Sequence, residues 1–204
     1  MGRPENNGLR AMAMTLLGNG LFEAKHYEDA LSVGEAELAM SRRLGASERD
    51  MLVKQNNLAS TYRTLGRSEQ ALQLKRDVNS GHLKLDGEEH ESTIIAANNY
   101  AGSLIRLERF EETKALLLRT LPAARRTLGE SHDLTLSMRS MYANVLYANP
   151  SATLDDLREA VETLEETEPI VRRILGGANP TLVPIVRALR AARAKLNARE
   201  PPNT

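Results

Sequence analysis

A short phrase recurs along the chain at a spacing of 42 residues. Residues 56–66 read NNLASTYRTLG, residues 98–108 read NNYAGSLIRLE, and a fainter copy, SMYANVLYANP, occupies residues 140–150. Apolar residues surround the centre of each copy at helical spacing, which predicts three equivalent helices. The centres are small residues that let a neighbouring helix approach closely, and a fourth precedes them: Gly18, Ala59, Ala101 and Ala143.

A second apolar segment follows each copy after a short turn, so the repeat is predicted to be a helical hairpin. These second segments carry small residues of their own, at Ala30, Ala71, Thr113 and Ala160. One hairpin cannot bury its apolar faces alone, whereas hairpins stacked side by side bury a continuous core. We therefore predict an all-α fold, an α-solenoid of four helical hairpins followed by a C-terminal capping helix.

The predicted domain is single and covers residues 9–199. Its repeats are expected at about 9–45, 47–87, 89–130 and 132–176, with the capping helix at 179–198. The segments 1–8 and 200–204 are expected to be disordered. Expected helix caps are Ser47, Ser131 and Asn179, the last followed by Pro180 at a first helical position.

The fourth hairpin departs from the others in its turn. The segment YANPSATLDD inserts residues there, and Pro150 ends the preceding helix. Thr153 and Asp156 resemble a capping box for the helix that follows. We expect a longer, exposed loop at this turn.

Composition limits the classes of function that fit. The 204 residues are 41% hydrophobic, have a formal net charge of zero and include no cysteine. Balanced charge gives no long-range attraction to nucleic acid or anionic membrane, and the lack of cysteine removes disulfides and thiolate metal sites. With no apolar run long enough to span a bilayer and no secretory signal, we expect a cytoplasmic protein without nucleic-acid or membrane partners.

The repeat resembles the tetratricopeptide repeat (TPR) family, in its 42-residue kinesin-light-chain-like variant. The resemblance rests on Asn-Asn-Leu-Ala at 56–59 with Tyr62, and on the endings LGESH at 128–132 and LGGANP at 175–180. Another α-solenoid, the HEAT class, has a similar repeat length, but the Asn-Asn-Leu-Ala signature decides against it. Three departures from the family pattern, Ser68, Lys75 and Glu108, predict looser packing where they occur.

The resemblance implies a right-handed superhelix whose first helices line a concave side, and a role as a non-catalytic protein–protein interaction scaffold. Three columns of equivalent positions share one face of those helices. The first is Thr15, Asn56, Asn98 and Ser140; the second is Asn19, Ser60, Gly102 and Asn144; the third is Phe22, Arg63, Ile105 and Tyr147. Asn57 and Asn99 are expected at the margin of this surface.

Most of these side chains are short, uncharged and able to donate and accept hydrogen bonds, so we predict a groove that binds an extended peptide of a partner protein. The alternative is that they are solvated polar faces, or that the asparagines brace adjacent helices. Because Arg63 is nearly the only cation in the columns, a clamp for a terminal carboxylate is disfavoured. A different role, self-assembly into a homodimer through terminal hairpins, also remains open.

No motif predicts catalysis, a cofactor or a metal site. His90 and His132 recur at the 42-residue spacing, but residues one repeat apart are too distant to share a zinc ion, so we interpret them as capping histidines. The stretch Thr153–Glu168 is acidic and the last helix is basic, which favours their docking.

Overall fold

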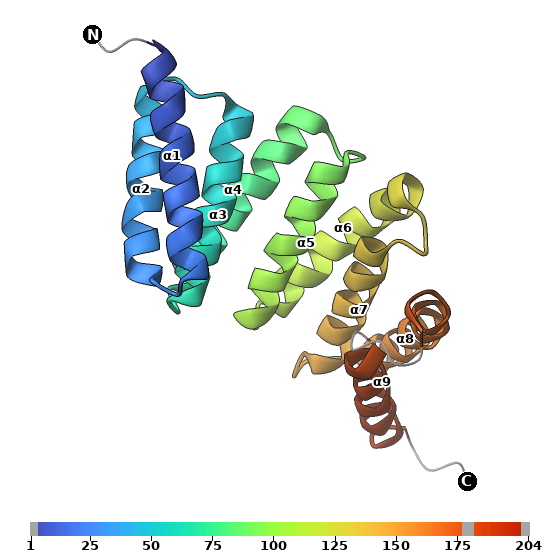
Figure 1. Ribbon diagram of the computed structural model, residues 1–204. Helices are drawn as coiled ribbons and strands as arrows, with labels where there is room; N and C mark the ends of the chain where they lie inside the picture. Colours follow the sequence, from blue (N-terminus) through green and yellow to red (C-terminus); the bar gives the residue numbers. More distant parts are fainter. Residues whose placement is uncertain (1–3, 177–181, 201–204) are drawn as a thin grey trace. The chain divides into compact units, whose positions relative to one another are not determined.

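The computed structural model describes residues 4–176 and 182–200, and within them the chain forms nine helices and no strand (Figure 1). The helices are α1 Pro4–Glu23, α2 Tyr27–Arg43, α3 Glu48–Thr64, α4 Ser68–Asp86, α5 Glu91–Arg106, α6 Phe110–Leu128, α7 Asp133–Ala148, α8 Leu154–Leu175 and α9 Leu182–Asn197. None of the helices in these two ranges is long and apolar enough to cross a membrane.

The helices pair into the four predicted hairpins: α1 with α2, α3 with α4, α5 with α6 and α7 with α8. The small residues at the repeat centres explain how closely the helices pack. Ala59, Ala101 and Ala143 are fully buried, whereas Gly18 of the first repeat is only partly buried. The second set, Ala30, Ala71, Thr113 and Ala160, is at most 3% exposed. The spacing of 42 therefore places equivalent side chains in equivalent core positions, as predicted.

The chain divides into two compact units, Met1–Gly87 and Glu88–Thr204, here named unit 1 and unit 2. In unit 1 the second helix of one hairpin, α2, packs on the first helix of the next, α3. In unit 2 the same contact recurs between α6 and α7 and between α8 and α9. The last helix thus takes the place of a first helix in a further repeat, and the single domain predicted over residues 9–199 stays a prediction.

The helix starts show which capping predictions hold. Ser47 caps α3, because its Oγ accepts a hydrogen bond from the backbone N–H of Asp50 at 3.1 Å. The capping box of α8, formed by Thr153 and Asp156, is also present. The first helix begins at Pro4, inside the segment 1–8 that was expected to be disordered.

The two recurring histidines are caps, as interpreted from the sequence. His90 Nδ1 accepts from the backbone N–H of Ser92, and His132 Nδ1 accepts from that of Leu134, both at 3.2 Å. The prediction that Ser131 caps α7 is therefore wrong, because the imidazole of the next residue reaches the free N–H group. Asn179 and Pro180 lie outside the described residues.

The turn inside each hairpin uses a left-handed residue at the same repeat position. Lys25, Gly66 and Glu108 have φ angles of 64°, 74° and 55°. In the fourth hairpin this position is Pro150, whose ring fixes φ near −65° and excludes the left-handed conformation. The chain therefore connects α7 and α8 through the longer loop 149–153, which was expected to be exposed and in which Ala152 is nevertheless buried.

The prediction of looser packing at Lys75 is wrong. This side chain in α4 is only 7% exposed, and its Nζ donates a hydrogen bond to Asn56 Oδ1 in α3 at 2.6 Å. A long aliphatic stem with a paired ammonium group fills the space that an aromatic ring fills in the family pattern.

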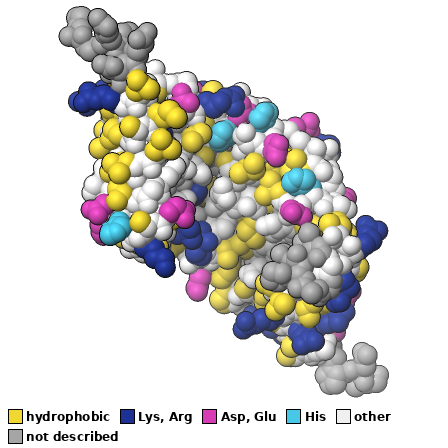
Figure 2. All heavy atoms as spheres, viewed as in Figure 1, with side chains coloured by type: hydrophobic (Ala, Val, Ile, Leu, Met, Phe, Trp, Pro, Cys, Tyr) yellow, Lys and Arg dark blue, Asp and Glu magenta, His cyan; other side chains and the backbone are white. Residues whose placement is uncertain are grey.

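A second feature of unit 1 is an apolar surface on its first helix. Four large hydrophobic side chains of α1 are more than half exposed: Leu9, Met12, Leu16 and Leu17. Figure 2 shows hydrophobic side chains gathered over this helix.

Candidate interaction site

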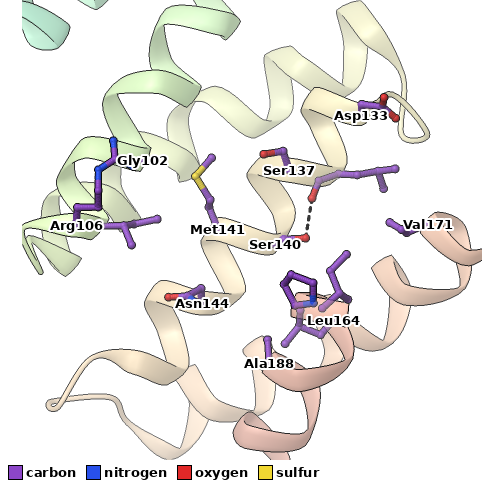
Figure 3. A pocket seen from close by; sticks show the side chains of 14 residues that line it. Gly102, Arg106, Asp133, Ser137, Ser140, Met141, Asn144, Leu164, Val171 and Ala188 are labelled. Carbon is purple, nitrogen blue, oxygen red and sulfur yellow. Dashed lines mark hydrogen bonds between the residues drawn. The ribbon is translucent and has the colours of Figure 1, made fainter. Parts of the chain in front are cut away.

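A pocket of about 480 Å³ lies among α5, α7, α8 and α9 of unit 2 (Figure 3). We name it the α5–α9 pocket. It is lined by Gly102, Ile105, Arg106, Asp133, Leu136, Ser137, Ser140, Met141, Asn144, Leu164, Val171, Pro184, Ile185 and Ala188.

Buried apolar side chains of α8 and α9 form one side of the pocket. Leu164 and Val171 belong to a stripe along α8 in which Ala160 and Thr167 are also buried, at alternating spacings of four and three residues. This spacing places all of them on one helical face. Ile185 of α9 is 4% exposed and completes this apolar wall.

Polar side chains of α7 follow the pocket along its length. Ser140 Oγ donates a hydrogen bond to the carbonyl of Leu136 at 2.9 Å, which is the bond drawn in Figure 3. Ser137 Oγ donates to Asn98 Oδ1 at 3.3 Å. Both hydroxyl groups already donate a hydrogen bond within the protein. They can therefore only accept hydrogen bonds from a ligand. One turn farther along, Asn144 adds an amide to the same wall.

The α5 side of the pocket is kept open by a glycine. Gly102 is in the middle of a helix, and a Cβ added there would meet no atom within 4 Å. The labelled Met141 side chain projects from α7 toward this helix in Figure 3. A side chain at position 102 would therefore enter the pocket space.

The last helix is held in place by contacts with the two preceding helices. Lys195 Nζ donates to the carbonyl of Tyr147 at 2.8 Å, and Arg193 forms an ion pair with Glu165 at 2.6 Å. The predicted docking of a basic helix on the acidic stretch is thus confirmed at this pair, although an exposed ion pair contributes only about 0–1 kcal/mol. Burial raises the pKa of the half-buried Tyr147, and nearby Arg187 opposes this shift.

A smaller pocket of about 170 Å³ lies among α1, α2 and α3 of unit 1 and is named the α1–α3 pocket. It is lined by Thr15, Gly18, Asn19, Phe22, Ala30, Gly34, Glu37, Lys54, Asn57, Leu58, Ser60 and Thr61. The Glu37 carboxylate forms an ion pair with Lys54 and accepts a hydrogen bond from the Thr15 hydroxyl. The side chains of Glu37 and Lys54 are only 9% and 15% exposed, so this pocket contains a nearly buried charge pair.

The predicted groove residues divide between these two pockets. The α1–α3 pocket brings together Thr15, Asn19, Phe22, Asn57 and Ser60. The α5–α9 pocket brings together Gly102, Ile105, Ser140 and Asn144. Five predicted residues line neither: Asn56, Arg63, Asn98, Asn99 and Tyr147.

Two of the predicted asparagines have a bracing role. Asn56 accepts the hydrogen bond of the buried Lys75 ammonium group, and Asn98 accepts that of Ser137 from the next hairpin. At these two positions the structure favours the alternative interpretation, in which the asparagines connect adjacent helices and do not bind a peptide. Phe22 also packs internally, edge to face on Tyr27 with ring centroids 5.3 Å apart, while Arg63 is exposed.

Sequence reasoning missed the contributions of α8 and α9 to the pocket of unit 2. The columns were drawn from the first helices of four repeats, whereas α9 acts as the first helix of a fifth. The signal was present in Ile185, Ala188 and Ala192, which share one face of α9 at spacings of three and four residues. The pair Glu37 and Lys54 was missed as well, because nothing in the sequence marks which charged residues will be buried together.

Within residues 4–176 and 182–200, no three or more His, Asp or Glu side chains gather into a group that could hold a metal ion. Both pockets have the geometry of a binding surface, with apolar walls and hydroxyl and amide groups. The α1–α3 pocket adds the Glu37–Lys54 pair, and the α5–α9 pocket adds the side chains of Arg106 and Asp133.

Comparison with known proteins supports the family predicted from the sequence. Residues 93–133 match the family model of the tetratricopeptide repeat. No curated protein sequence matches the chain significantly.

The solved structures that resemble the chain are also repeat proteins. Two crystal structures of the nearly identical TPR-like repeats of a kinesin-light-chain-like protein from Podosopora anserina match with TM-scores of 0.78 and 0.76, at 22% and 23% identity. The matches cover 97% and 98% of this chain and 91% and 90% of those chains. BtubC (BKLC) from P. vanneervenii matches with a TM-score of 0.62 at 16% identity, over 98% of this chain and 86% of that chain. The predicted resemblance and the α-solenoid fold of TPR-like hairpins are thereby confirmed.

Proposed function

We propose that this chain of tetratricopeptide-like repeats is a non-catalytic scaffold that binds a segment of a partner protein in the α5–α9 pocket. The TPR-repeat fold supports a protein–protein interaction scaffold in general. The observation that carries the finer proposal is the pocket itself, about 480 Å³ in volume, with buried apolar side chains on one wall and hydroxyl and amide groups on the other. Its volume is within the range of about 300–1,000 Å³ that is usual for ligand sites.

The arrangement of the polar groups favours a peptide over a compact small molecule. Ser137, Ser140 and Asn144 are spaced by three and four residues, so they follow one face of α7 for two helical turns. Acceptors distributed along a line suit the N–H groups of a chain that runs beside the helix. The apolar wall with Leu164 and Ile185 suits an aliphatic side chain of that segment.

A peptide library displayed on phage tests this proposal. Peptides selected on the whole protein are synthesised with a fluorescent label, and their affinities are measured by fluorescence anisotropy. We expect Gly102→Leu to lower the affinity at least tenfold, because the added side chain occupies pocket space without meeting a neighbouring atom at its Cβ. Asn144→Ala is expected to lower it about fivefold, the effect of one hydrogen bond.

Gly8→Leu is the matched control. Gly8 is also helical, its added Cβ also meets no atom within 4 Å, and it belongs to α1 of unit 1. Circular dichroism confirms that each variant is folded. If the selected peptides bind Gly102→Leu as tightly as the unaltered chain, the α5–α9 pocket is not their site and the proposal is wrong.

A further inference from the structure

The α1–α3 pocket of unit 1 contains hydrogen-bonding groups that the fold itself does not use. The carboxylate of Glu37 accepts hydrogen bonds from Lys54 Nζ and from the Thr15 hydroxyl, and both bonds are made to Oε1. Within residues 4–176 and 182–200 no hydrogen bond is made to Oε2. The ammonium group of Lys54 has three N–H groups, and its bond to Glu37 uses one of them. The pocket wall therefore offers an acceptor and donors next to each other.

Burial increases the value of a ligand that would use these groups. The side chains of Glu37 and Lys54 are only 9% and 15% exposed, and both of them line the pocket. Hydrogen bonds are stronger in such low-dielectric surroundings than at the surface, and a buried polar group without a partner is costly. A ligand group that donates to Oε2 and accepts from Nζ would gain from both effects.

The charge balance of the pocket disfavours a charged ligand. Glu37 and Lys54 are the two charged residues among those that line it, and their charges cancel. A carboxylate or ammonium group entering the pocket would therefore leave water without a net counter-charge. An uncharged group avoids this cost. The uncharged protein groups that both donate and accept hydrogen bonds are hydroxyls, peptide units and carboxamides.

Among these three, a primary carboxamide matches the geometry of the pair. Its oxygen and one of its N–H groups lie on the same edge of a planar group, so it can accept from Lys54 Nζ and donate to Glu37 Oε2 together. In a trans peptide unit the N–H and the C=O point to opposite sides, so one unit cannot make both bonds. A hydroxyl would have to make both bonds through a single oxygen atom.

We propose that the α1–α3 pocket is a separate binding site that takes the carboxamide of a glutamine or asparagine side chain of a partner protein. Its volume of about 170 Å³ is below the range of about 300–1,000 Å³ that is usual for whole ligands, so it suits one side chain. Phe22 and Leu58 also line it and suit the methylene groups of that side chain. This inference goes beyond the proposed function and does not rest on it, because the α5–α9 pocket belongs to unit 2.

Titration of the whole chain with butanamide, followed by NMR of its backbone N–H groups, tests this site. Butanamide is an uncharged carboxamide on a short alkyl chain. We expect saturable shifts of the signals of Gly18, Asn57 and Ser60, which line the pocket. For so small a ligand the dissociation constant should be on the order of 1–10 mM. Butanoate, butylammonium and the trans secondary amide N-methylacetamide should bind at least roughly tenfold more weakly.

Two variants connect the binding to the ion pair. Glu37→Gln keeps the size of the side chain and leaves Lys54 as a cation without its carboxylate, so butanoate should then bind at least about fivefold more tightly than butanamide. The double variant Lys54→Met with Glu37→Thr removes both charges, and its affinity for butanamide should fall at least about tenfold. Circular dichroism shows that each chain is folded, and the double variant does not leave a buried charge alone.

Arg63→Met is the matched control, because it removes a cation from the same helix at an exposed position that does not line the pocket. It should bind butanamide like the unaltered chain. The proposal is overturned if butanamide shifts none of the three signals well above the expected constant, if butanoate binds the unaltered chain equally well, or if the double variant keeps its affinity. Gly102→Leu, which fills the α5–α9 pocket, should bind butanamide unchanged. A loss of binding in that variant would place the site in unit 2 and overturn the proposal.

Discussion

The two pockets occupy comparable faces of their units but differ in the burial of their charged side chains. Arg106 and Asp133 of the α5–α9 pocket are exposed. In unit 1, Lys54 and Glu37 form a nearly buried ion pair in the α1–α3 pocket. The equivalent pair between successive hairpins of unit 2 is Thr120 of α6 and Met138 of α7, which are both buried and uncharged. Hairpin geometry is set by the small residues that recur every 42 positions, whereas the chemistry of a pocket is set by a few side chains that the repeat leaves free to vary.

The units also differ in where a second ion pair lies. In unit 2 Lys114 of α6 pairs with Asp156 of α8 at 2.5 Å, with 30% and 18% of the side chains exposed. Lys114 occupies the repeat position of Leu31 and Leu72, which are buried apolar residues of unit 1. Each unit thus has an ion pair between successive hairpins, and in unit 1 the two charged side chains also line a pocket.

Removing the cation of the unit 1 pocket is expected to have the largest effect. Lys54→Met leaves the Glu37 carboxylate nearly buried without its cation, which should lower the free energy of unfolding by about 3–5 kcal/mol. Adding Glu37→Thr should recover most of the loss, because the pocket then carries the uncharged residues that unit 2 carries at these positions. Urea unfolding followed by circular dichroism measures both variants.

Arg63→Met is the control for this series, because it also removes a cation but from an exposed position of α3. It should change the free energy of unfolding by less than about 0.5 kcal/mol. A Lys54→Met chain as stable as the unaltered one would show that the charge pair does not distinguish the two units.

The ion pair of unit 2 should give a smaller effect that depends on pH. The hydrogen bond from Lys114, with one from the Thr153 backbone, lowers the pKa of Asp156 from 3.8 to about 2. Because the folded-state pKa is the lower one, the stabilisation is fully present above about pH 4 and is lost as the pH falls toward 2. It amounts to about 2 kcal/mol, so Asp156→Asn should lower stability by that amount at pH 7.

The measurement is urea unfolding at several pH values between 2 and 7. The Asp156→Asn chain should lose less stability than the unaltered chain between pH 4 and pH 2. Asp155→Asn, at the neighbouring exposed position, should leave the pH dependence unchanged. Equal slopes for the unaltered and Asp156→Asn chains would contradict the assignment.

Two helical glycines, one from each unit, should respond to substitution by alanine in opposite directions. A Cβ at Gly81 of α4 would come within 2.5 Å of Leu52 Cδ2, so Gly81→Ala should cost about 1–3 kcal/mol. Gly102 of α5 has open space, so Gly102→Ala should gain about 0.5–1 kcal/mol by restricting the unfolded chain. Thermal unfolding measures both, and the same sign in both variants would show that the open wall of the pocket has been misidentified.

The fold could be predicted from the sequence because its main determinants recur. Ala59, Ala101 and Ala143 are equivalent in sequence and equally buried, so periodicity alone identified the hairpins. The capping box of α8 was also predictable, because it is local: it depends on Thr153 and Asp156, which are three positions apart. Such local and repeated features are visible without knowledge of tertiary contacts.

The candidate site was only partly predictable because it depends on contacts that do not recur. Asn56 and Asn98 have the same place in the repeat, yet one accepts from Lys75 of its own hairpin and the other from Ser137 of the next. The wall that α9 adds through Ile185 belongs to an incomplete fifth repeat, which lies outside the four-repeat columns. The sequence pattern predicts which residues share one face of a helix, but it does not predict which element packs against that face.

The left-handed turns have a consequence for engineering the chain. Lys25 and Glu108 adopt positive φ angles that cost a residue with a Cβ on the order of 1–2 kcal/mol, whereas Gly66 adopts the same angle freely. Neither residue lines either pocket. The two hairpin corners are therefore sites where glycine could raise the melting temperature of the scaffold while leaving its binding surfaces untouched.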